Sequence, residues 1–281
     1  MGMTPTVAII APGNMGAGVG QRLVENGVTV LTALAGRSPA SAARARTAGM
    51  TAVEDRGLAE ADFLLSIVPP GEALALARRL APMLASANNK PVYVECNAVN
   101  PQTVAQIEAV VAATGCLFVG AGIIGPPPKP GSGNTKFYAA GPAAVRFATL
   151  NDHGLIVRVL DGPVAAASAL KMSYAGITKG LTALAAAMLL AAERGGAAAA
   201  LHQELTESQP ALLAWFTRQL PAMYPKAYRW VAEMDEIAGF VGADHAEHAM
   251  LAAAARLYER LAADAAGANA ETSALSKFLG L

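Results

Sequence analysis

Residues 7–16 of the chain read VAIIAPGNMG, an apolar run that passes directly into a glycine turn. The run predicts a short β-strand, and the pattern of residues 17–26 predicts a helix. A strand, a glycine turn and a helix in this order form the phosphate-binding turn of a Rossmann dinucleotide fold, here with Ala11 in place of the first glycine. We expect the cofactor phosphates to lie against the following turn residues: Gly13, Asn14, Met15 and Gly16.

The two glycines of the turn have different expected roles. Gly13 would let the backbone approach the pyrophosphate, and Gly16 would let the helix pack closely on the strand. A tight structural turn without a ligand is the alternative interpretation. The preceding strand, the following helix and a second strand at the expected distance favour the dinucleotide site.

The first half of the chain continues to alternate between strands and helices. Further runs that predict strands lie at residues 28–34, 63–68, 91–95, 116–119, 135–139 and 155–160. From Pro163 onward no segment predicts a strand, and helices are predicted for one long segment, residues 163–192, and for residues 197–205, 210–219, 227–240 and 246–263. The pattern predicts an α/β fold: an N-terminal doubly wound Rossmann domain over residues 1–162, followed by an all-α domain over 163–281.

The end of the second strand indicates which dinucleotide is bound. A site for NAD(H) would place an acidic residue there to bind the ribose hydroxyls. No acidic residue occurs between Glu25 and Glu54, and the strand is followed by Gly36-Arg37-Ser38-Pro39. An arginine beside a hydroxyl suits the 2′-phosphate of NADP(H), so we expect Arg37 and Ser38 to bind it. A solvated loop charge is the alternative for Arg37.

Two further strands end in residues that suit a ligand site. Val68, Pro69 and Pro70 end one strand, and the turn from Asn97 to Asn100 follows the next. Both turns would lie at the carboxyl edge of the parallel sheet, where ligands bind in such folds. We expect the Val68–Pro70 turn and Asn97 to contact the cofactor, and Asn100 to contact the substrate. Ordinary turn chemistry is the alternative for both asparagines.

Composition and charge argue against several other classes of function. The 281 residues carry no net charge, and the lysines and arginines form no cluster, so neither nucleic acid nor an anionic membrane is an expected partner. The longest apolar run, residues 180–192, is shorter than a membrane span. Cys96 and Cys116 fall in predicted buried strands, which favours a reducing, cytoplasmic location. His245 and His248 lack a third ligand in register, so no metal site is expected.

Lys171 is the leading catalytic candidate. It lies near the start of the long helix in the segment SALKMSYA, residues 168–175. If the helix buries it, desolvation would lower its pKa and let it exchange protons near neutrality. Thr178 would share its helix face, and Tyr174 would lie to one side. A lysine that only extends its ammonium into solvent is the alternative interpretation.

These motifs together resemble the β-hydroxyacid dehydrogenases and their relatives, the 6-phosphogluconate dehydrogenases and imine reductases. The resemblance covers the whole length and becomes diffuse after about residue 195. It implies NADP(H)-dependent hydride transfer, with a helix lysine that exchanges the hydroxyl proton. That lysine matches Lys171, with Tyr174 as a second catalytic candidate. Imine reductases usually lack this lysine, so the resemblance favours carbonyl and alcohol chemistry.

The chain departs from the family pattern at two positions that bind substrate. Ala175 stands where the family has asparagine, and Gly122-Ile123-Ile124-Gly125-Pro126 stands where it has a Ser-Gly-Gly turn for the substrate carboxylate. Both changes make the pocket less polar. The substrate-binding residues expected on this basis are Asn100, Ile123, Ile124 and Thr178, and a less polar substrate than a small hydroxyacid is expected.

Two other functions remain open at this stage. Loss of the carboxylate-binding turn is compatible with reduction of a C=N bond, and the same departures are compatible with a non-catalytic NADP(H)-binding module. The long alanine-rich helices of the second half suggest a homodimer that interlocks its helical domains.

Overall fold

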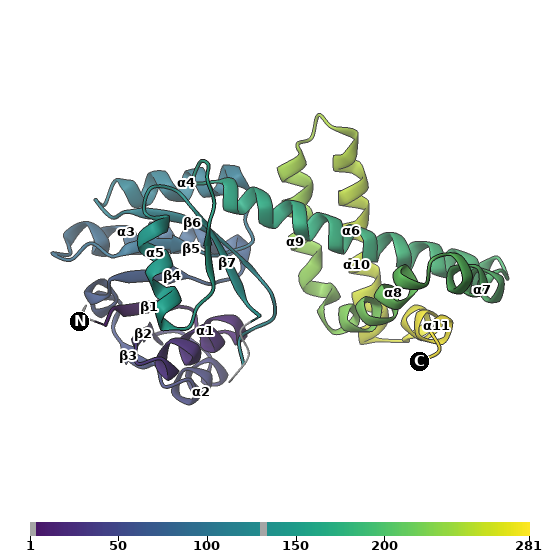
Figure 1. Ribbon diagram of the computed structural model, residues 1–281, viewed down its shortest axis with the longest axis horizontal. Helices are drawn as coiled ribbons and strands as arrows, with labels where there is room; N and C mark the ends of the chain where they lie inside the picture. Colours follow the sequence, from purple (N-terminus) through teal and green to yellow (C-terminus); the bar gives the residue numbers. More distant parts are fainter. Residues whose placement is uncertain (1–3, 130–133) are drawn as a thin grey trace. The chain divides into compact units, whose positions relative to one another are not determined.

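The computed structural model describes residues 4–129 and 134–281, which form two compact units, residues 1–171 and 172–281. The first unit is built on an eight-stranded sheet of order β3-β2-β1-β4-β5-β6-β7-β8, in which only the β6–β7 pair is antiparallel (Figure 1). The strands are β1 Thr6–Ile10, β2 Thr29–Ala33, β3 Thr51–Val53, β4 Phe63–Ser66, β5 Val92–Glu95, β6 Phe118–Ile124, β7 Lys136–Ala140 and β8 Val157–Val159. This confirms the predicted Rossmann-like α/β class, with β3 as a strand that the sequence analysis missed.

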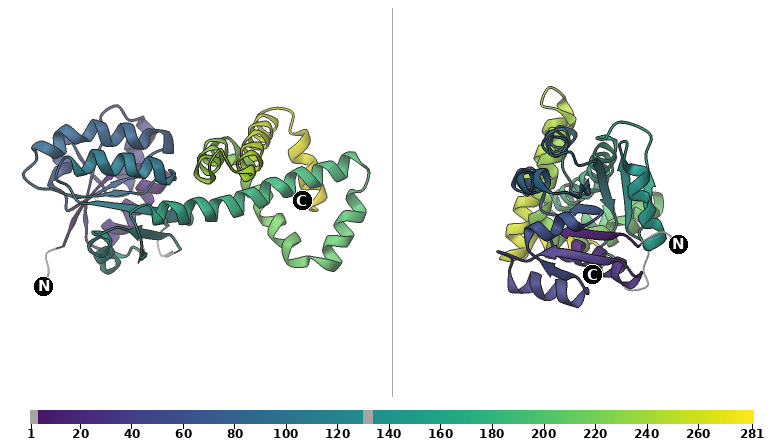
Figure 2. Two further views of the ribbon diagram at one scale, coloured as in Figure 1. Left: turned by 90° about the horizontal axis from the view of Figure 1, so that it is seen from above. Right: turned by 90° about the vertical axis from the view of Figure 1, so that its left-hand side faces the viewer.

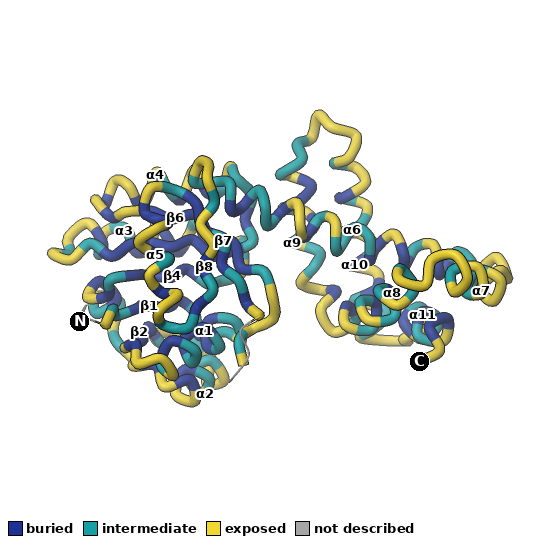
Figure 3. The backbone as a smooth tube through the Cα atoms, viewed as in Figure 1, coloured by how far each residue is buried: buried dark blue, intermediate teal, exposed yellow. Residues whose placement is uncertain are grey.

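Helices cover both faces of this sheet and bury its apolar strands. Their bounds are α1 Asn14–Glu25, α2 Pro39–Thr47, α3 Ala73–Ser86, α4 Pro101–Ala112 and α5 Ala144–Ala148, with short 3₁₀ helices at Asp55–Glu60, Pro70–Glu72 and Thr149–His153. Leu23 of α1 and Phe147 of α5 belong to one buried cluster, whereas Leu80 of α3 and Ile107 of α4 belong to another. Two separate cores on one sheet explain why the central strands read as continuous apolar runs. Figure 3 shows the strands as the buried centre of this unit.

Local sequence signals start several of these helices. Ser38 precedes α2, its Oγ accepts a hydrogen bond from the Ser41 backbone N–H at 3.2 Å, and Pro39 is the first helical residue. Asn100 does the same for α4, where its Oδ1 accepts from the Thr103 N–H at 2.9 Å and Pro101 follows. A polar cap followed by proline satisfies an otherwise open backbone donor and fixes the first helical torsion angle.

The second unit consists of helices. α6, Ala166–Arg194, begins in the first unit and continues into the second, where it is followed by α7 Ala198–Ser208, α8 Pro210–Met223, the 3₁₀ helix Tyr224–Lys226, α9 Ala227–Val241, α10 Ala246–Ala266 and α11 Ala270–Phe278. α9 and α10 run side by side, as Figure 2 shows. The predicted division after Gly162 precedes α6, whereas the division of the structure falls inside this helix.

Polar contacts fix α6 against α9 and α10 within the second unit. Lys179 forms a largely buried ion pair with Glu233, and its ammonium lies 5.3 Å from the centre of the Trp230 ring. The Tyr258 hydroxyl donates to the Lys179 carbonyl at 2.6 Å. The ion pair joins α6 to α9, and the Tyr258 hydrogen bond joins α6 to α10.

By length and composition alone, α6 could cross a membrane. Its most apolar 18-residue window has a mean hydropathy of 1.6, but 44% of that window is buried inside the protein. A largely buried core helix has the same composition, so this property is weak evidence for a membrane span.

Candidate functional site

The glycine turn lies between β1 and α1 at the carboxyl edge of the sheet. A Cβ atom on Gly16 would lie 2.0 Å from the Ala11 carbonyl oxygen, so only glycine lets α1 approach the end of β1 this closely. A Cβ atom on Gly13 would meet no atom within 4 Å. The fold therefore requires Gly16, while Gly13 faces open space where a ligand can approach the backbone.

The N-terminus of α1 is open to an anion. Gly13 is the N-cap, no side chain caps the helix there, and the first turn contains no acidic residue. The backbone N–H groups of the first turn and the helix dipole both favour a negatively charged ligand at this point. The predicted residues Asn14 and Met15 belong to this first turn.

The loop after β2 carries the residues expected to bind a 2′-phosphate. Ser38 Oγ donates to Ser41 Oγ at 3.2 Å. Arg37 is half-buried, and its guanidinium has no hydrogen-bond or ion-pair partner among the residues that the structure describes. An arginine that no carboxylate neutralises leaves its donors available for a phosphate.

Arg44 is a cationic residue near this site that sequence reasoning missed. From α2, its Nε donates to the Pro12 carbonyl at 3.1 Å and a terminal nitrogen donates to Ser41 Oγ at 3.0 Å. It therefore links the phosphate turn to the first turn of α2. Beside it, a hollow of about 340 Å³ lies between α1 and α2, with Asn14 in its lining. In the sequence, the only signal of this role was that Arg44 follows Ser41 by three residues, which is about one turn of the helix that Ser38 caps.

Asn97 ties together the ends of β4 and β5. Its Oδ1 accepts from the Val68 N–H at 2.6 Å, and its Nδ2 donates to Ser66 Oγ at 2.8 Å. The Asn97 backbone N–H donates to Glu95 Oε1 at 2.9 Å. The residues predicted to contact the cofactor here, Val68 and Asn97, are thus bonded to each other, with Pro69 and Pro70 continuing the same turn. We call Ser66, Val68, Glu95 and Asn97 the β4–β5 clamp.

Glu95 is the second functional candidate that sequence reasoning missed. It is fully buried, and desolvation raises the pKa of its carboxyl to about 7, although the hydrogen bond from the Asn97 backbone N–H opposes this. In the sequence, the only sign of a special role for Glu95 was an acidic residue at the end of the otherwise uncharged strand β5.

Lys171 lies close to β6, at the same edge of the sheet. Its Nζ donates to the Ile123 carbonyl at 2.7 Å. The approach depends on Gly122, where a Cβ would lie 2.9 Å from the Ala167 carbonyl and 3.1 Å from Lys171 Cβ. Upstream in α6, the buried Ser168 hydroxyl donates to the Val99 carbonyl, which anchors the helix start on the turn after β5.

Ile123 contributes its backbone here, not its side chain. The side chain is 6% exposed and belongs to a core cluster of the first unit, so it does not form the expected pocket wall. Ile124 is half-buried. Asn100 uses its side-chain oxygen to cap α4, which is the turn chemistry considered as the alternative for this residue.

Tyr174 and Thr178 belong to the second unit. Tyr174 is 50% exposed, and the Thr178 hydroxyl donates back to the Tyr174 carbonyl at 2.9 Å. In the described ranges no three His, Cys, Asp or Glu side chains gather as metal ligands, and the His248 ring is hydrogen-bonded to the Ala238 carbonyl at 2.8 Å.

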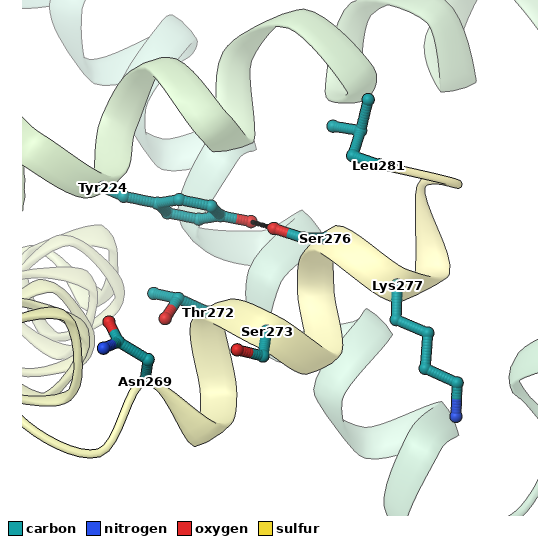
Figure 4. Close-up of a pocket in the computed structure, with 7 residues that line it drawn as sticks. All are labelled: Tyr224, Asn269, Thr272, Ser273, Ser276, Lys277 and Leu281. Carbon is teal, nitrogen blue, oxygen red and sulfur yellow. Dashed lines mark hydrogen bonds between the residues drawn. The ribbon is translucent and has the colours of Figure 1, made fainter.

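The second unit also contains an open hollow of about 480 Å³ beside α11, shown in Figure 4. Neutral hydroxyls form most of its polar lining, with Ser276 Oγ donating to the Tyr224 hydroxyl at 3.4 Å. Burial raises the pKa of Tyr224, which keeps this phenol neutral. The hollow brings together no acid, base and nucleophile, so it is not the candidate site.

Alanine substitutions at the two turn glycines should separate folding from ligand binding. Gly16→Ala should lower the free energy of unfolding by roughly 1–3 kcal/mol, because its methyl group would overlap backbone. Gly13→Ala should leave stability within about 0.5 kcal/mol, yet weaken NADPH binding by roughly tenfold or more, because the methyl group would occupy the space the phosphates need. Urea denaturation and calorimetric titration measure both quantities. Unchanged NADPH affinity in Gly13→Ala would contradict this assignment.

Comparison with known proteins agrees with the geometry of the first unit. Residues 6–152 match the family model described as the NAD binding domain of 6-phosphogluconate dehydrogenase, and residues 192–261 match a domain of unknown function, DUF1932. No curated protein matches the chain significantly.

Three solved structures show how far the likeness extends. A conserved protein of unknown function, described as structurally similar to 3-hydroxyacid dehydrogenases, is 30% identical, with 93% of this chain and 98% of that chain covered and a TM-score of 0.72. Mycobacterium tuberculosis 3-hydroxyisobutyrate dehydrogenase with L-serine is 22% identical, with 94% and 96% covered and a TM-score of 0.75. An imine reductase from Myxococcus stipitatus with NADP⁺ is 18% identical, with 98% and 100% covered and a TM-score of 0.54; these last two show the fold.

The open phosphate turn, the doubly wound sheet and a family match over more than half of the chain lead to one assignment. This chain belongs to the family defined by the NAD binding domain of 6-phosphogluconate dehydrogenase.

Proposed function

We propose that this protein is an NADP(H)-dependent oxidoreductase that transfers hydride between the nicotinamide and a hydroxy or carbonyl substrate. The observation that carries the proposal is the position of Lys171, whose Nζ is held on the Ile123 carbonyl at the carboxyl edge of the sheet. Ligands bind at this edge in doubly wound folds.

The residues present fit a dinucleotide phosphate. Gly13 leaves space for it, the α1 N-terminus offers backbone donors, and Arg37 has no carboxylate partner in the described chain. When bound, NADPH supplies the hydride. Gly13 and the first turn of α1 would hold the pyrophosphate, and Arg37 with Ser38 would hold the 2′-phosphate.

Lys171 would supply the proton that balances the hydride. In the reducing direction, hydride adds to the carbonyl carbon, the C=O π pair moves onto oxygen, and that oxygen takes a proton from the Lys171 ammonium. The Ile123 carbonyl accepts one N–H of the ammonium at 2.7 Å, which holds the ammonium at the carboxyl edge of the sheet. In the oxidising direction, neutral Lys171 takes the proton back. Tyr174 is retained as a second catalytic candidate.

The apolar character of two segments sustains a second candidate reaction. Ala175 is buried where the related dehydrogenases have a polar side chain, and Ile123 and Ile124 replace a polar turn. Reduction of a C=N bond needs the same hydride and proton, and it needs no carboxylate anchor. A panel that pairs cyclic imines with keto acids separates the two reactions. Turnover of any member excludes a non-catalytic NADP(H)-binding module.

Replacing Lys171 should remove turnover and spare cofactor binding. With a carbonyl substrate found in the panel, Lys171→Met should lower kcat by roughly 100-fold or more, because the developing alkoxide loses its proton donor. Its Kd for NADPH should stay within about twofold of wild type. Lys277→Met, at an exposed lysine, serves as the matched control. Full turnover in Lys171→Met would show that the lysine has no catalytic role.

Calorimetric titration with NADPH and with NADH tests the cofactor assignment. The wild type should prefer NADPH, and Arg37→Ala should weaken NADPH binding by roughly tenfold or more, because the 2′-phosphate loses a charge-assisted hydrogen bond. Its affinity for NADH should not change. Arg46→Ala, at an exposed arginine of α2, is the control. A wild-type preference for NADH would refute this assignment.

We also propose a homodimer that covers one side of α6 with a second copy of the chain. Four exposed apolar side chains lie along this helix: Tyr174 at 50%, Ile177 at 70%, Leu184 at 58% and Met188 at 53% exposure. With the half-buried Leu181, they repeat at alternating intervals of three and four residues. This is the spacing by which one helix packs against another, and an apolar stripe of this kind is unusual on a monomer.

Introducing a charge into the stripe should dissociate the dimer. Ile177→Glu should sediment as a monomer at micromolar concentration, where the wild type should sediment as a dimer, because a buried unpaired carboxylate disfavours association. Val145→Glu, at an equally exposed apolar residue of α5, should remain dimeric. A monomeric wild type would remove this proposal.

A further inference from the structure

Glu95 is an unusual carboxylic acid because the sheet encloses it completely. It is the last residue of β5, in register with Ser66 of β4 and Gly120 of β6, and its solvent exposure is 0%. Oε1 accepts from the Asn97 N–H at 2.9 Å, whereas Oε2 is buried without a hydrogen-bond partner in the described residues. The Tyr93 hydroxyl, two residues earlier on the same strand, is also buried without one.

Among the described residues, the groups that act on Glu95 include no cation that would stabilise its ionised form. Tyr93 of β5, Ser66 of β4, and Cys96 and Asn97 of the segment after β5 lie close enough to interact with it. From α3, Arg79 acts on Tyr93 and is already paired with Asp55. Burial therefore dominates and raises the pKa of Glu95 to about 7. A neutral carboxyl also supplies an O–H donor that the ionised form lacks.

Glu95 is connected through Asn97 to the end of β4 at the carboxyl edge of the sheet. It holds the Asn97 backbone, and the Asn97 side chain holds the Val68 N–H and the Ser66 hydroxyl. These bonds fix the carboxyl ends of β4 and β5 relative to each other. In a doubly wound sheet, the half that contains these strands receives the nicotinamide end of a dinucleotide.

We propose that Glu95 is a positioning residue that holds the β4–β5 clamp in its binding geometry only while its carboxyl is neutral. Ionisation places an unpaired negative charge in the core. This charge destabilises the β4–β5 clamp and repels the anionic dinucleotide. The identity of the ligand rests on the function proposed above. Glu95 itself touches neither cofactor nor substrate.

The direction of the pH effect follows from the raised pKa. A carboxyl titrates near 4.5 when unburied and near 7 in the folded protein, so its contribution to stability is complete below about 4.5 and is lost as the pH rises through about 7. Since the neutral form is the one that positions the clamp, NADPH affinity should fall over the same upper range.

Glu95→Gln provides the test, because glutamine keeps a neutral carbonyl and a donor but does not titrate. Calorimetry measures the Kd of NADPH at about pH 6 and about pH 8.5. The wild-type Kd should rise roughly tenfold or more relative to that of Glu95→Gln across this interval. The 2′-phosphate of NADPH ionises in the same pH range, but it does so equally with both proteins. The ratio of the wild-type Kd to the Glu95→Gln Kd therefore isolates the effect of Glu95. Glu60→Gln, at an exposed acid, should follow the wild type.

The outcomes separate this proposal from the proposed function. Equal pH profiles for wild type and Glu95→Gln overturn the positioning role, while NADPH binding itself stands. No binding of NADPH or NADH at either pH refutes the proposed function, and the positioning role with it. If Glu95→Gln does not fold, infrared spectroscopy of the wild type gives the answer. The C=O band of the neutral buried carboxyl should disappear in step with NADPH affinity, and a carboxyl that is ionised throughout overturns the proposal.

Discussion

The close approach of helix backbone to strand backbone is the constraint on which the site depends. Gly16 lets α1 reach the end of β1, where a Cβ would lie 2.0 Å from a carbonyl oxygen. The same condition recurs at β6, where Gly120 and Gly122 leave no room for a side chain against residues 164–171. One contact directs the α1 N-terminus at the position of the phosphates, and the other brings Lys171 within 2.7 Å of the Ile123 carbonyl. The positions of the α1 N-terminus and of Lys171 therefore both depend on glycines, which have no side chain.

Charge is distributed unevenly along this edge of the sheet, although the chain as a whole has no net charge. At the ends of β1 and β2 lie the α1 N-terminus, Arg37 and Arg44, with no acid from residue 26 to residue 53. At the ends of β4, β5 and β6 lie Ser66, Asn97, the Lys171 ammonium and Glu95, whose pKa burial raises to about 7. Positive charge and open helix N–H donors are thus concentrated around the α1 N-terminus, where they favour an anionic ligand.

Local patterns were sufficient to predict the elements that carry strong periodicity, and insufficient where position depends on distant contacts. The strand–turn–helix at the start, the further strands of the parallel core and the long α6 were predicted because apolar runs, caps and glycines act within a few residues. β3 has three residues and two exposed positions, so it has no apolar signature, and α11 follows Asn269 in a left-handed conformation. Arg44 and Glu95 were missed because their importance comes from Pro12, Ser66 and Asn97, which only the tertiary structure brings near.

The continuity of α6 has a consequence for how such proteins exchange parts. Val164, just before this helix, covers Gly120, and the first turns of the helix cover Gly122 and carry Ser168 and Lys171 before the chain enters the second unit. A recombination event in the loop before the helix would separate the sheet from its own covering residues. A crossover after Lys171 would keep them together and let the remaining helices vary. In this architecture the natural joint between an inherited dinucleotide module and a replaceable helical module lies inside a helix, where sequence alone shows no linker.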